Sequence, residues 1–201
     1  MKKGLLVVVS GPAGSGKGTV NGILLETGEY VYSVSATTRA PRPGEVDGVN
    51  YHYITREEFE ERIAGKKMLE YTEYCGNYYG TPLKEALEVL DSGKNLLLEI
   101  EVEGAANVKA KYPDAVLIML LPPSFAVQEA RLRGRGTETE EKILARLDQA
   151  RRELPRFTEY DYVVYNYDGC VKQTADKIRA IVSAETAAIK RNPNVAQNYF
   201  E

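Results

Sequence analysis

The sequence predicts an α/β protein built on a mainly parallel β-sheet flanked by helices. Three observations predict this class. Strand and helix patterns alternate along most of the 201 residues. The apolar runs at 96–98 and 116–120 are continuous, which is typical of strands covered on both faces. A glycine-rich loop joins the first predicted strand to the first predicted helix.

The predicted core consists of residues 1–34, 94–123 and 156–190. A strand over 5–10 is followed by a helix over 17–25. Further strands are predicted at 95–100, 115–121 and 162–165, with helices over 104–111 and 171–184. In the last helix, Ile178, Ile181 and Val182 fall at helical spacing, so that one apolar face can pack on the sheet.

Two insertions interrupt the alternation. Residues 35–93 contain candidate strands at 50–54, 68–73 and 77–80, and a helix opened by a capping box at 55–58, which together predict a small α+β subdomain. Residues 124–155 contain two helical segments joined by a Gly/Arg run, with a second capping box at 137–140 restarting the helix. This helical hairpin predicts a hinged lid. No element is predicted for the tail, residues 191–201.

Composition limits the classes of function. A net charge of −3 predicts no general affinity for nucleic acid or anionic membranes, so any anion site must be local. Cys75 and Cys170 lack metal-ligand spacing, and the single His52 cannot form a histidine-rich metal site. Because no segment is apolar enough for secretion or a membrane span, we expect a cytoplasmic protein. The sequence leaves the oligomeric state open.

The loop after the first strand has the Walker A spacing, with Gly11, four residues, and then Gly16 and Lys17. Its glycines let backbone N–H groups turn toward phosphate oxygens, and Lys17 supplies a charge for the β- and γ-phosphates. Gly18 follows Lys17 where Ser or Thr is usual, which leaves open whether Thr19 touches a metal directly. The predicted ATP-binding residues of the loop are Gly11, Pro12, Ala13, Gly14, Ser15, Gly16, Lys17, Gly18 and Thr19.

Candidate anion-binding and base-reading side chains lie in the first insertion. Arg39 and Arg42 occupy a proline-stiffened segment in which both guanidinium groups can converge on one anion, although a solvated basic loop is the alternative. Glu70 and the run at 76–81 supply a carboxylate, phenols and a threonine hydroxyl able to read a purine edge. The same side chains are equally suited to packing in a sheet.

Two carboxylates end the predicted strand at 95–100. Glu99 and Glu101, two residues apart, face the same way at the edge of the sheet where open α/β folds bind ligands. This is a position like that of Walker B. Glu99 and Thr19 are therefore the candidate Mg²⁺ ligands, either directly or through water.

The chain resembles the guanylate kinases, P-loop nucleoside monophosphate kinases that transfer the γ-phosphoryl group of ATP to GMP. The resemblance spans residues 4–185. It rests on four motifs in the family's order: Ser-Gly-Pro-Ala-Gly-Ser-Gly-Lys at 10–17, Ser-Ala-Thr-Thr-Arg-Ala-Pro-Arg-Pro-Gly-Glu at 35–45, Gly-Asn-Tyr-Tyr-Gly-Thr at 76–81 and Arg-Gly-Arg-Gly-Thr-Glu at 133–138. It implies a P-loop NTPase-type core, a GMP-binding subdomain at 35–93, a lid at 124–155 and a function in purine nucleotide metabolism and the recycling of GMP.

The resemblance also implies Mg²⁺ with ATP as the donor, and a role for each matching residue. Lys17, Arg39, Arg135 and Arg146 are the implied catalytic residues, the last two carried by the lid. Asn166 lies near the adenine of ATP, and Arg135 also meets the ATP phosphates. The implied GMP-binding residues are Ser35, Arg39, Arg42, Tyr51 and Tyr79 at the phosphate, Glu70 and Thr81 at the guanine, and Glu101. The family more often has aspartate at the position of Glu101.

Two other functions fit the same fold. One is a non-catalytic module similar to the guanylate-kinase-like domains of scaffold proteins, which bind phosphopeptides and usually have eroded nucleotide loops. The intact loop through Lys17 argues against it. The other is a relative that phosphorylates a ribose bisphosphate. Glu70, Tyr79 and Thr81 argue against this alternative, because a sugar phosphate has no base edge to read.

Overall fold

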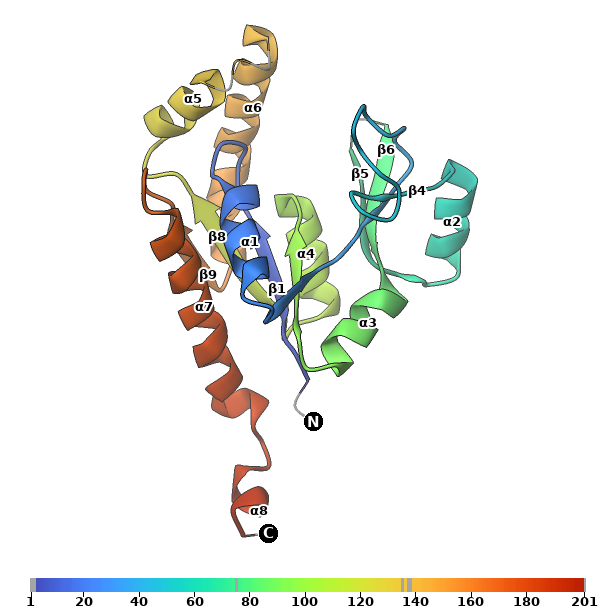
Figure 1. The fold of residues 1–201 in the computed structure, drawn as a ribbon, viewed down its shortest axis with the longest axis vertical. Coiled ribbons are helices and arrows are strands. Elements are labelled where there is room, and N and C mark those ends of the chain that lie inside the picture. Colours follow the sequence, from blue (N-terminus) through green and yellow to red (C-terminus); the bar gives the residue numbers. More distant parts are fainter. Residues whose placement is uncertain (1–2, 75, 135, 137–138, 201) are drawn as a thin grey trace.

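The computed structural model describes residues 3–200 except 75, 135, 137 and 138. Its core is a five-stranded parallel sheet in the order β2-β7-β1-β8-β9 (Figure 1). The strands are β1 (Leu6–Ser10), β2 (Tyr30–Tyr32), β7 (Asn95–Glu99), β8 (Val116–Leu121) and β9 (Tyr162–Tyr165). This arrangement confirms the predicted parallel sheet, and it puts β1, which leads into the glycine-rich loop, in the centre.

Helices cover both faces of this sheet. On one face, Val7 and Val9 pack with residues of α1 (Lys17–Glu26) and α7 (Val171–Ala187). On the other, Leu6 and Val8 pack with α3 (Leu83–Asp91) and α4 (Val102–Lys111), where Ala86 is fully buried. Because neighbouring residues of a strand point to opposite faces, a strand covered on both sides must be apolar throughout. The continuous apolar runs in the sequence have this origin.

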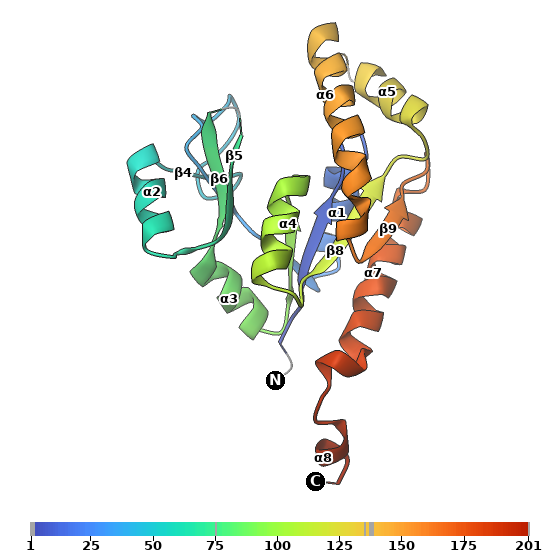
Figure 2. The ribbon, with the colours of Figure 1, turned by 180° about the vertical axis from the view of Figure 1, so that it is seen from behind.

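A second, four-stranded sheet in the order β4-β3-β6-β5 lies beside the core (Figures 1 and 2). Its strands are β3 (Ala36–Thr37), β4 (His52–Tyr53), β5 (Met68–Tyr74) and β6 (Asn77–Pro82), and α2 (Arg56–Ala64) covers it with the buried Phe59. As predicted from the box at 55–58, Glu58 N–H donates to Thr55 Oγ1 at 3.1 Å. All these elements fall within residues 35–93.

The helical hairpin consists of α5 (Phe125–Gly134) and α6 (Glu140–Glu153), followed by the 3₁₀ helix η1 (Leu154–Glu159). Leu132 of α5 packs on Ile143 and Leu147 of α6. The capping box predicted at 137–140 is not where the helix starts. Thr139 is the N-cap of α6, and the Glu140 carboxylate pairs with Arg133, which removes it from the capping role predicted for it. Thr137 and Glu138 lie outside the described residues.

Several elements were not predicted. The strands β2 and β3 are too short to show a periodic pattern. Helix α3 carries apolar residues at helical spacing, but in a segment interpreted mainly as strands. The tail forms η2 (Ile189–Arg191) and α8 (Val195–Phe200), and α8 projects away from the body (Figure 1). Across the described ranges, no helix combines the length and apolar character needed to cross a membrane.

A buried carboxylate ties the end of α7 to the core. Glu185 is only 7% exposed and accepts hydrogen bonds from the Tyr162 hydroxyl at 2.6 Å and from Arg191 Nε at 2.9 Å. Lys190 Nζ lies 3.3 Å from the same carboxylate. Burial alone would raise the pKa of Glu185, but the bonds from Tyr162, Arg191 and Lys190 together lower its pKa to about 2. The carboxylate therefore joins β9, α7 and η2.

We expect Glu185→Gln to lower the free energy of unfolding by about 1–3 kcal/mol at pH 7, because an amide cannot replace a carboxylate between two cations. The wild-type carboxyl has its folded pKa below its unfolded value of 4.5, so its contribution is present above pH 4.5 and is lost as the pH falls toward 2. Urea unfolding at pH 7 and pH 3 measures this. The exposed Glu88→Gln is the control, and an unchanged midpoint for Glu185→Gln at pH 7 would contradict the assignment.

Candidate active site

The glycine-rich loop follows a path that only glycine allows at two positions. Gly11 has φ +149° and Gly16 has φ +91°. A Cβ at Gly11 would lie 2.1 Å from the Leu120 carbonyl oxygen, and one at Gly16 would lie 2.4 Å from Asn166 Nδ2. The ends of β8 and β9 therefore lie in close contact with the loop, and a side chain at position 11 or 16 would push the loop away from them.

Lys17 lies at the start of α1 and folds back over the loop. Its ammonium donates to the carbonyl oxygen of Gly11 at 2.6 Å and lies 3.4 Å from that of Pro12. The first N–H groups of α1 have no partners inside the helix, so they face the same region as the ammonium. Backbone donors and one mobile positive charge thus converge, which is the arrangement that a phosphate chain requires.

Side chains from two distant segments brace the loop. Gln128 Nε2 donates to the Ala13 carbonyl at 2.9 Å, and Arg131 donates to the Gly14 carbonyl at 3.3 Å. Asn166, which is 3% exposed, donates its amide to the Ser15 carbonyl at 2.9 Å. The predicted ATP residue Asn166 therefore uses its amide to hold the loop.

One cavity, of about 380 Å³, opens on the side of the loop that faces α7. It contains Thr19 and Asn166, both predicted as ATP-binding residues, and it lies where β9 ends. Its lining residues are Gly14, Gly16, Thr19, Arg131, Gly134, Asn166, Tyr167, Asp168, Gly169 and Val171.

A second cavity, of about 270 Å³, lies between the small sheet, the end of β7 and α6. The small sheet and the loops beside it contribute four predicted residues, β7 and the turn after it contribute two carboxylates, and α6 contributes an arginine. These are Ser35, Tyr51, Glu70, Tyr79, Glu99, Glu101 and Arg146. The structure thus brings together residues that lie more than a hundred positions apart in the sequence.

Glu70 is the most perturbed carboxyl of this cavity. It is 2% exposed, and Thr81 donates its hydroxyl to Glu70 Oε1 at 2.8 Å. Burial raises the pKa of Glu70 to about 7, although the bonds from Thr81 oppose the rise. A buried carboxyl with a strongly shifted pKa in a cavity is typical of a binding or catalytic site.

The acidic strand end lies next to the loop. Glu99 pairs in register with Val9 of β1, and Asn21 Nδ2 of α1 donates to Glu99 Oε2 at 2.8 Å. Glu101 follows on the same wall of the second cavity. Of the two residues predicted as metal ligands, Thr19 lines the first cavity and Glu99 the second.

The arginines differ in their surroundings. The Arg39 guanidinium lies 5.6 Å from the ring centre of Tyr51, next to the second cavity. Arg42 is exposed on the same loop, and Arg146 lines the cavity from α6. Arg135 lies outside the described residues.

Sequence reasoning missed three residues that hold the site. Arg131 braces the loop and lines the first cavity, Asn21 orients Glu99, and Glu45 binds Arg39. Arg131 precedes the Arg-Gly-Arg run at 133–135 in the sequence. Glu45 ends the motif at 35–45 that contains Arg39, so the local sequence could have indicated it. Asn21 acts on a partner 78 positions away, which no local pattern indicates.

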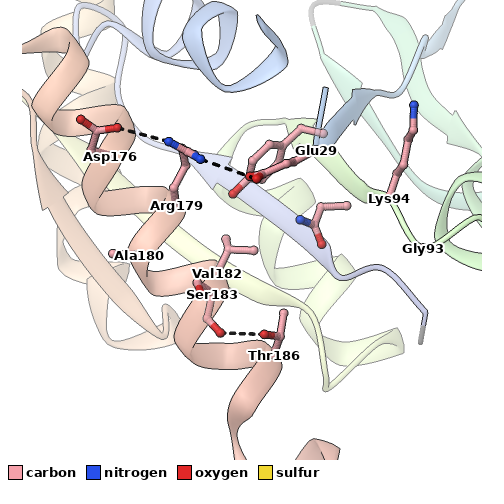
Figure 3. A pocket seen from close by; sticks show the side chains of 11 residues that line it. Glu29, Gly93, Lys94, Asp176, Arg179, Ala180, Val182, Ser183 and Thr186 are labelled. Atoms are coloured by element: carbon pink, nitrogen blue, oxygen red, sulfur yellow. Dashed lines mark hydrogen bonds and ion pairs between the residues drawn. The ribbon is translucent and has the colours of Figure 1, made fainter. Parts of the chain in front are cut away.

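A further cavity, of about 610 Å³, lies at the opposite end of the sheet, where β2 and β7 begin (Figure 3). In it, Arg179 of α7 lies 3.5 Å from Glu29 and 3.6 Å from Asp176. Because ligands of open α/β sheets bind at the carboxyl ends of the strands, the two cavities around the loop are the better candidate site.

This fold and this loop define a nucleotide-binding α/β protein of the P-loop class. The family model described as guanylate kinase matches residues 3–185. A guanylate kinase of Halalkalibacterium halodurans is 54% identical over 185 residues, covering 92% of this chain and 90% of the relative. One of Streptococcus pneumoniae strain R6 is 51% identical and covers 94% and 91%.

A solved structure gives the same result. The crystal structure of guanylate kinase from Anaplasma phagocytophilum aligns with a TM-score of 0.75 at 34% identity, covering 95% of this chain and 90% of that chain. The chain belongs to the guanylate kinase family.

We expect the buried Glu70 carboxyl to destabilise the folded state when it is ionised. Its folded pKa of about 7 exceeds its unfolded value of 4.5, so the folded state loses stability as the pH rises from 4.5 through 7. We therefore expect Glu70→Gln to raise the free energy of unfolding on the order of 1–3 kcal/mol at pH 8, and to change it little at pH 5. Thermal unfolding at both pH values measures the difference. The control is Glu73→Gln on the same strand, and an equal effect of Glu70→Gln at both pH values would contradict the prediction.

Proposed function

We propose that the chain transfers the γ-phosphoryl group of ATP to GMP, giving ADP and GDP. Family membership supports this reaction, since guanylate kinase relatives near 50% identity cover more than nine-tenths of the chain. The observation that carries the proposal is a cavity beside the phosphate-binding loop and a second cavity at the end of β7, the strand that pairs with β1. Two nucleotides bound in them would meet end to end at Lys17.

The donor occupies the first cavity. Backbone N–H groups of residues 11–19 hold the ATP phosphates, and Lys17 neutralises the β- and γ-phosphates. The adenosine lies toward Arg131, Asn166 and Tyr167. Thr19, which lines this cavity, supports a role at the phosphates.

The acceptor occupies the second cavity. Ser35, Tyr51 and Tyr79 donate to the phosphate of GMP, with Arg39 and Arg42 supplying positive charge. Glu70 accepts from N1–H and the exocyclic amine of guanine. The Thr81 hydroxyl, which donates to Glu70 in this structure, turns to donate to O6 when guanine binds. Glu101 lies on the same wall and completes the acceptor site. The burial of Glu70 supports this reading, because a desolvated carboxylate gains most from a matching donor.

Transfer needs positioning and charge neutralisation rather than covalent help. The acceptor phosphate is ionised at neutral pH, so its oxygen attacks in line and no general base is required. Arg146 and Arg135, carried by the segment 124–155, shield the charge that spreads over the transferring group. Closure of this segment as a lid excludes water from the site.

The residues present fit a magnesium ion that is held mostly by phosphates and water. Glu99 offers a hard carboxylate oxygen beside the loop, and Asn21 occupies only its Oε2 atom. When bound, Mg²⁺ neutralises charge on the β- and γ-phosphates. Glu99 orients the hydrated ion, and Thr19 contacts the donor phosphates from the other side. The cytoplasmic location expected from the sequence stays a prediction.

We expect the acceptor preference to follow the guanine pattern. GMP and dGMP serve as acceptors with Mg-ATP, and IMP, which lacks the exocyclic amine, falls between GMP and AMP. AMP and UMP are poorer by roughly 10⁴-fold, because they leave the buried polar groups of the site unpaired. Coupled measurement of ADP formation over this set gives the result. Equal turnover of GMP and AMP would contradict the guanine assignment.

We expect Lys17→Ala to lower the rate of transfer by roughly 10²- to 10³-fold, because a preorganised charge at the transferring group is lost. The fold should survive, since the side chain bonds only to loop carbonyls. Lys84→Ala is the matched control, as this lysine is 85% exposed and far from both cavities. Unchanged transfer by Lys17→Ala would favour a non-catalytic binding module instead.

A further inference from the structure

The loop between β3 and β4 folds around the carboxylate of Glu45. Its Oε2 accepts hydrogen bonds from the Arg42 backbone N–H at 2.7 Å, from the Tyr53 hydroxyl at 2.8 Å and from Arg39 at 3.0 Å. Its Oε1 accepts a further bond from Arg39 at 3.0 Å. The side chains of Arg39 and Glu45 are only 16% and 19% exposed. This pair therefore differs from exposed surface ion pairs, which contribute little.

A tight turn places this carboxylate. The sequence Arg42-Pro43-Gly44-Glu45 closes with a hydrogen bond from the Glu45 N–H to the Arg42 carbonyl at 3.0 Å, and Gly44 has φ +86°. Proline followed by glycine at the two central positions is the pattern of a type II turn. The turn returns the Glu45 carboxylate to the Arg42 N–H.

Arg39 is held from several sides. Its NH1 donates to the Ala40 carbonyl at 2.7 Å, and its NH2 donates to both Glu45 oxygens. The rings of Tyr51 and Tyr53 lie 5.6 and 5.8 Å from the guanidinium, measured to their centres. The bonds to Ala40 and Glu45 use one hydrogen of NH1 and the NH2 group, so the Nε–H and the second hydrogen of NH1 remain for Tyr79 and for an incoming anion. An arginine fixed in advance loses less side-chain entropy when the anion binds.

We propose that Glu45 is a positioning residue, which holds Arg39 in the orientation that meets the phosphate of the acceptor nucleotide. This inference rests on the proposed function. Glu45 lies behind Arg39 and does not itself contact the acceptor. It therefore contributes to the part of the affinity that depends on the phosphate and not to the part that depends on the base.

The charge of Glu45 is stable. The Arg42 N–H lowers the pKa of Glu45, and the bonds from Tyr53 and Arg39 add to this effect, so that despite burial the pKa is about 2. The carboxylate stays ionised over the range in which kinases are assayed. The effect of removing it is therefore the same at pH 6 and pH 9.

The test compares GMP with guanosine, which lacks the phosphate. Calorimetry gives the affinity of wild type and Glu45→Gln for both ligands. We expect GMP to bind about tenfold more weakly to the variant, the scale of one charge-assisted hydrogen bond, and guanosine to bind unchanged. In steady-state assays, the KM for GMP rises while the KM for ATP stays constant. Glu45→Asp keeps the charge on a shorter side chain, so its affinity for GMP should lie between those of wild type and Glu45→Gln. This variant replaces Glu45→Gln in the test if the amide variant does not fold.

Glu73→Gln is the matched control. It removes a carboxylate that binds another arginine, Arg56, at 3.0 Å in the same small sheet. If Glu45 only stabilises the fold, both variants lower the melting temperature and leave the ratio of GMP to guanosine affinity unchanged, which overturns the proposal. Tighter binding of GMP to Glu45→Gln also overturns it, since Glu45 would then compete with the phosphate for Arg39.

A double-mutant cycle tests whether Glu45 acts through Arg39. In an Arg39→Ala background, Glu45→Gln should change the affinity for GMP no further. An additional loss there overturns the proposal. A wild-type protein that does not phosphorylate GMP contradicts the proposed function and the inference together. An active wild type with an unchanged affinity ratio in Glu45→Gln overturns the inference alone.

Discussion

The close approach of the phosphate loop to its neighbours is the constraint on which the rest of the structure depends. The loop passes within van der Waals distance of the Leu120 carbonyl and the Asn166 amide, so glycine is required at 11 and 16. β8 must therefore lie beside β1, and β9 must end at the loop. The sheet that carries the loop is packed with apolar side chains on both faces.

The acceptor side is built on a different principle. Its charged groups each have a partner that fixes them: Thr81 binds Glu70, Asn21 binds Glu99, and Glu45 binds Arg39. Burying such groups is unfavourable, and the hydrogen bonds offset only part of the cost. These buried polar groups lie in the small sheet and at the end of β7, whereas the core of the large sheet is packed with apolar residues. Stability and recognition are thus assigned to separate parts of the chain.

Local patterns made the parallel sheet and the phosphate loop predictable, because spacing within a dozen residues defines each. Glu70 and Tyr79 were assigned through the resemblance, since a carboxylate and a phenol in a strand are equally suited to packing. Asn21 acts on a residue 78 positions away and Arg131 on one 117 positions away, so no local pattern indicates either contact. The prediction of a box at 137–140 was wrong because the N-cap of α6 is Thr139, which makes Glu140 the first residue of the helix and not the third.

The brace between α5 and the loop has a mechanical consequence. Gln128 and Arg131 anchor this helix to the backbone around Ala13 and Gly14, so α5 is fixed to the loop. Leu132 of the same helix packs on Ile143 and Leu147 of α6. Because α6 carries Arg146, the placement of that arginine relative to the loop depends on the packing around Leu132.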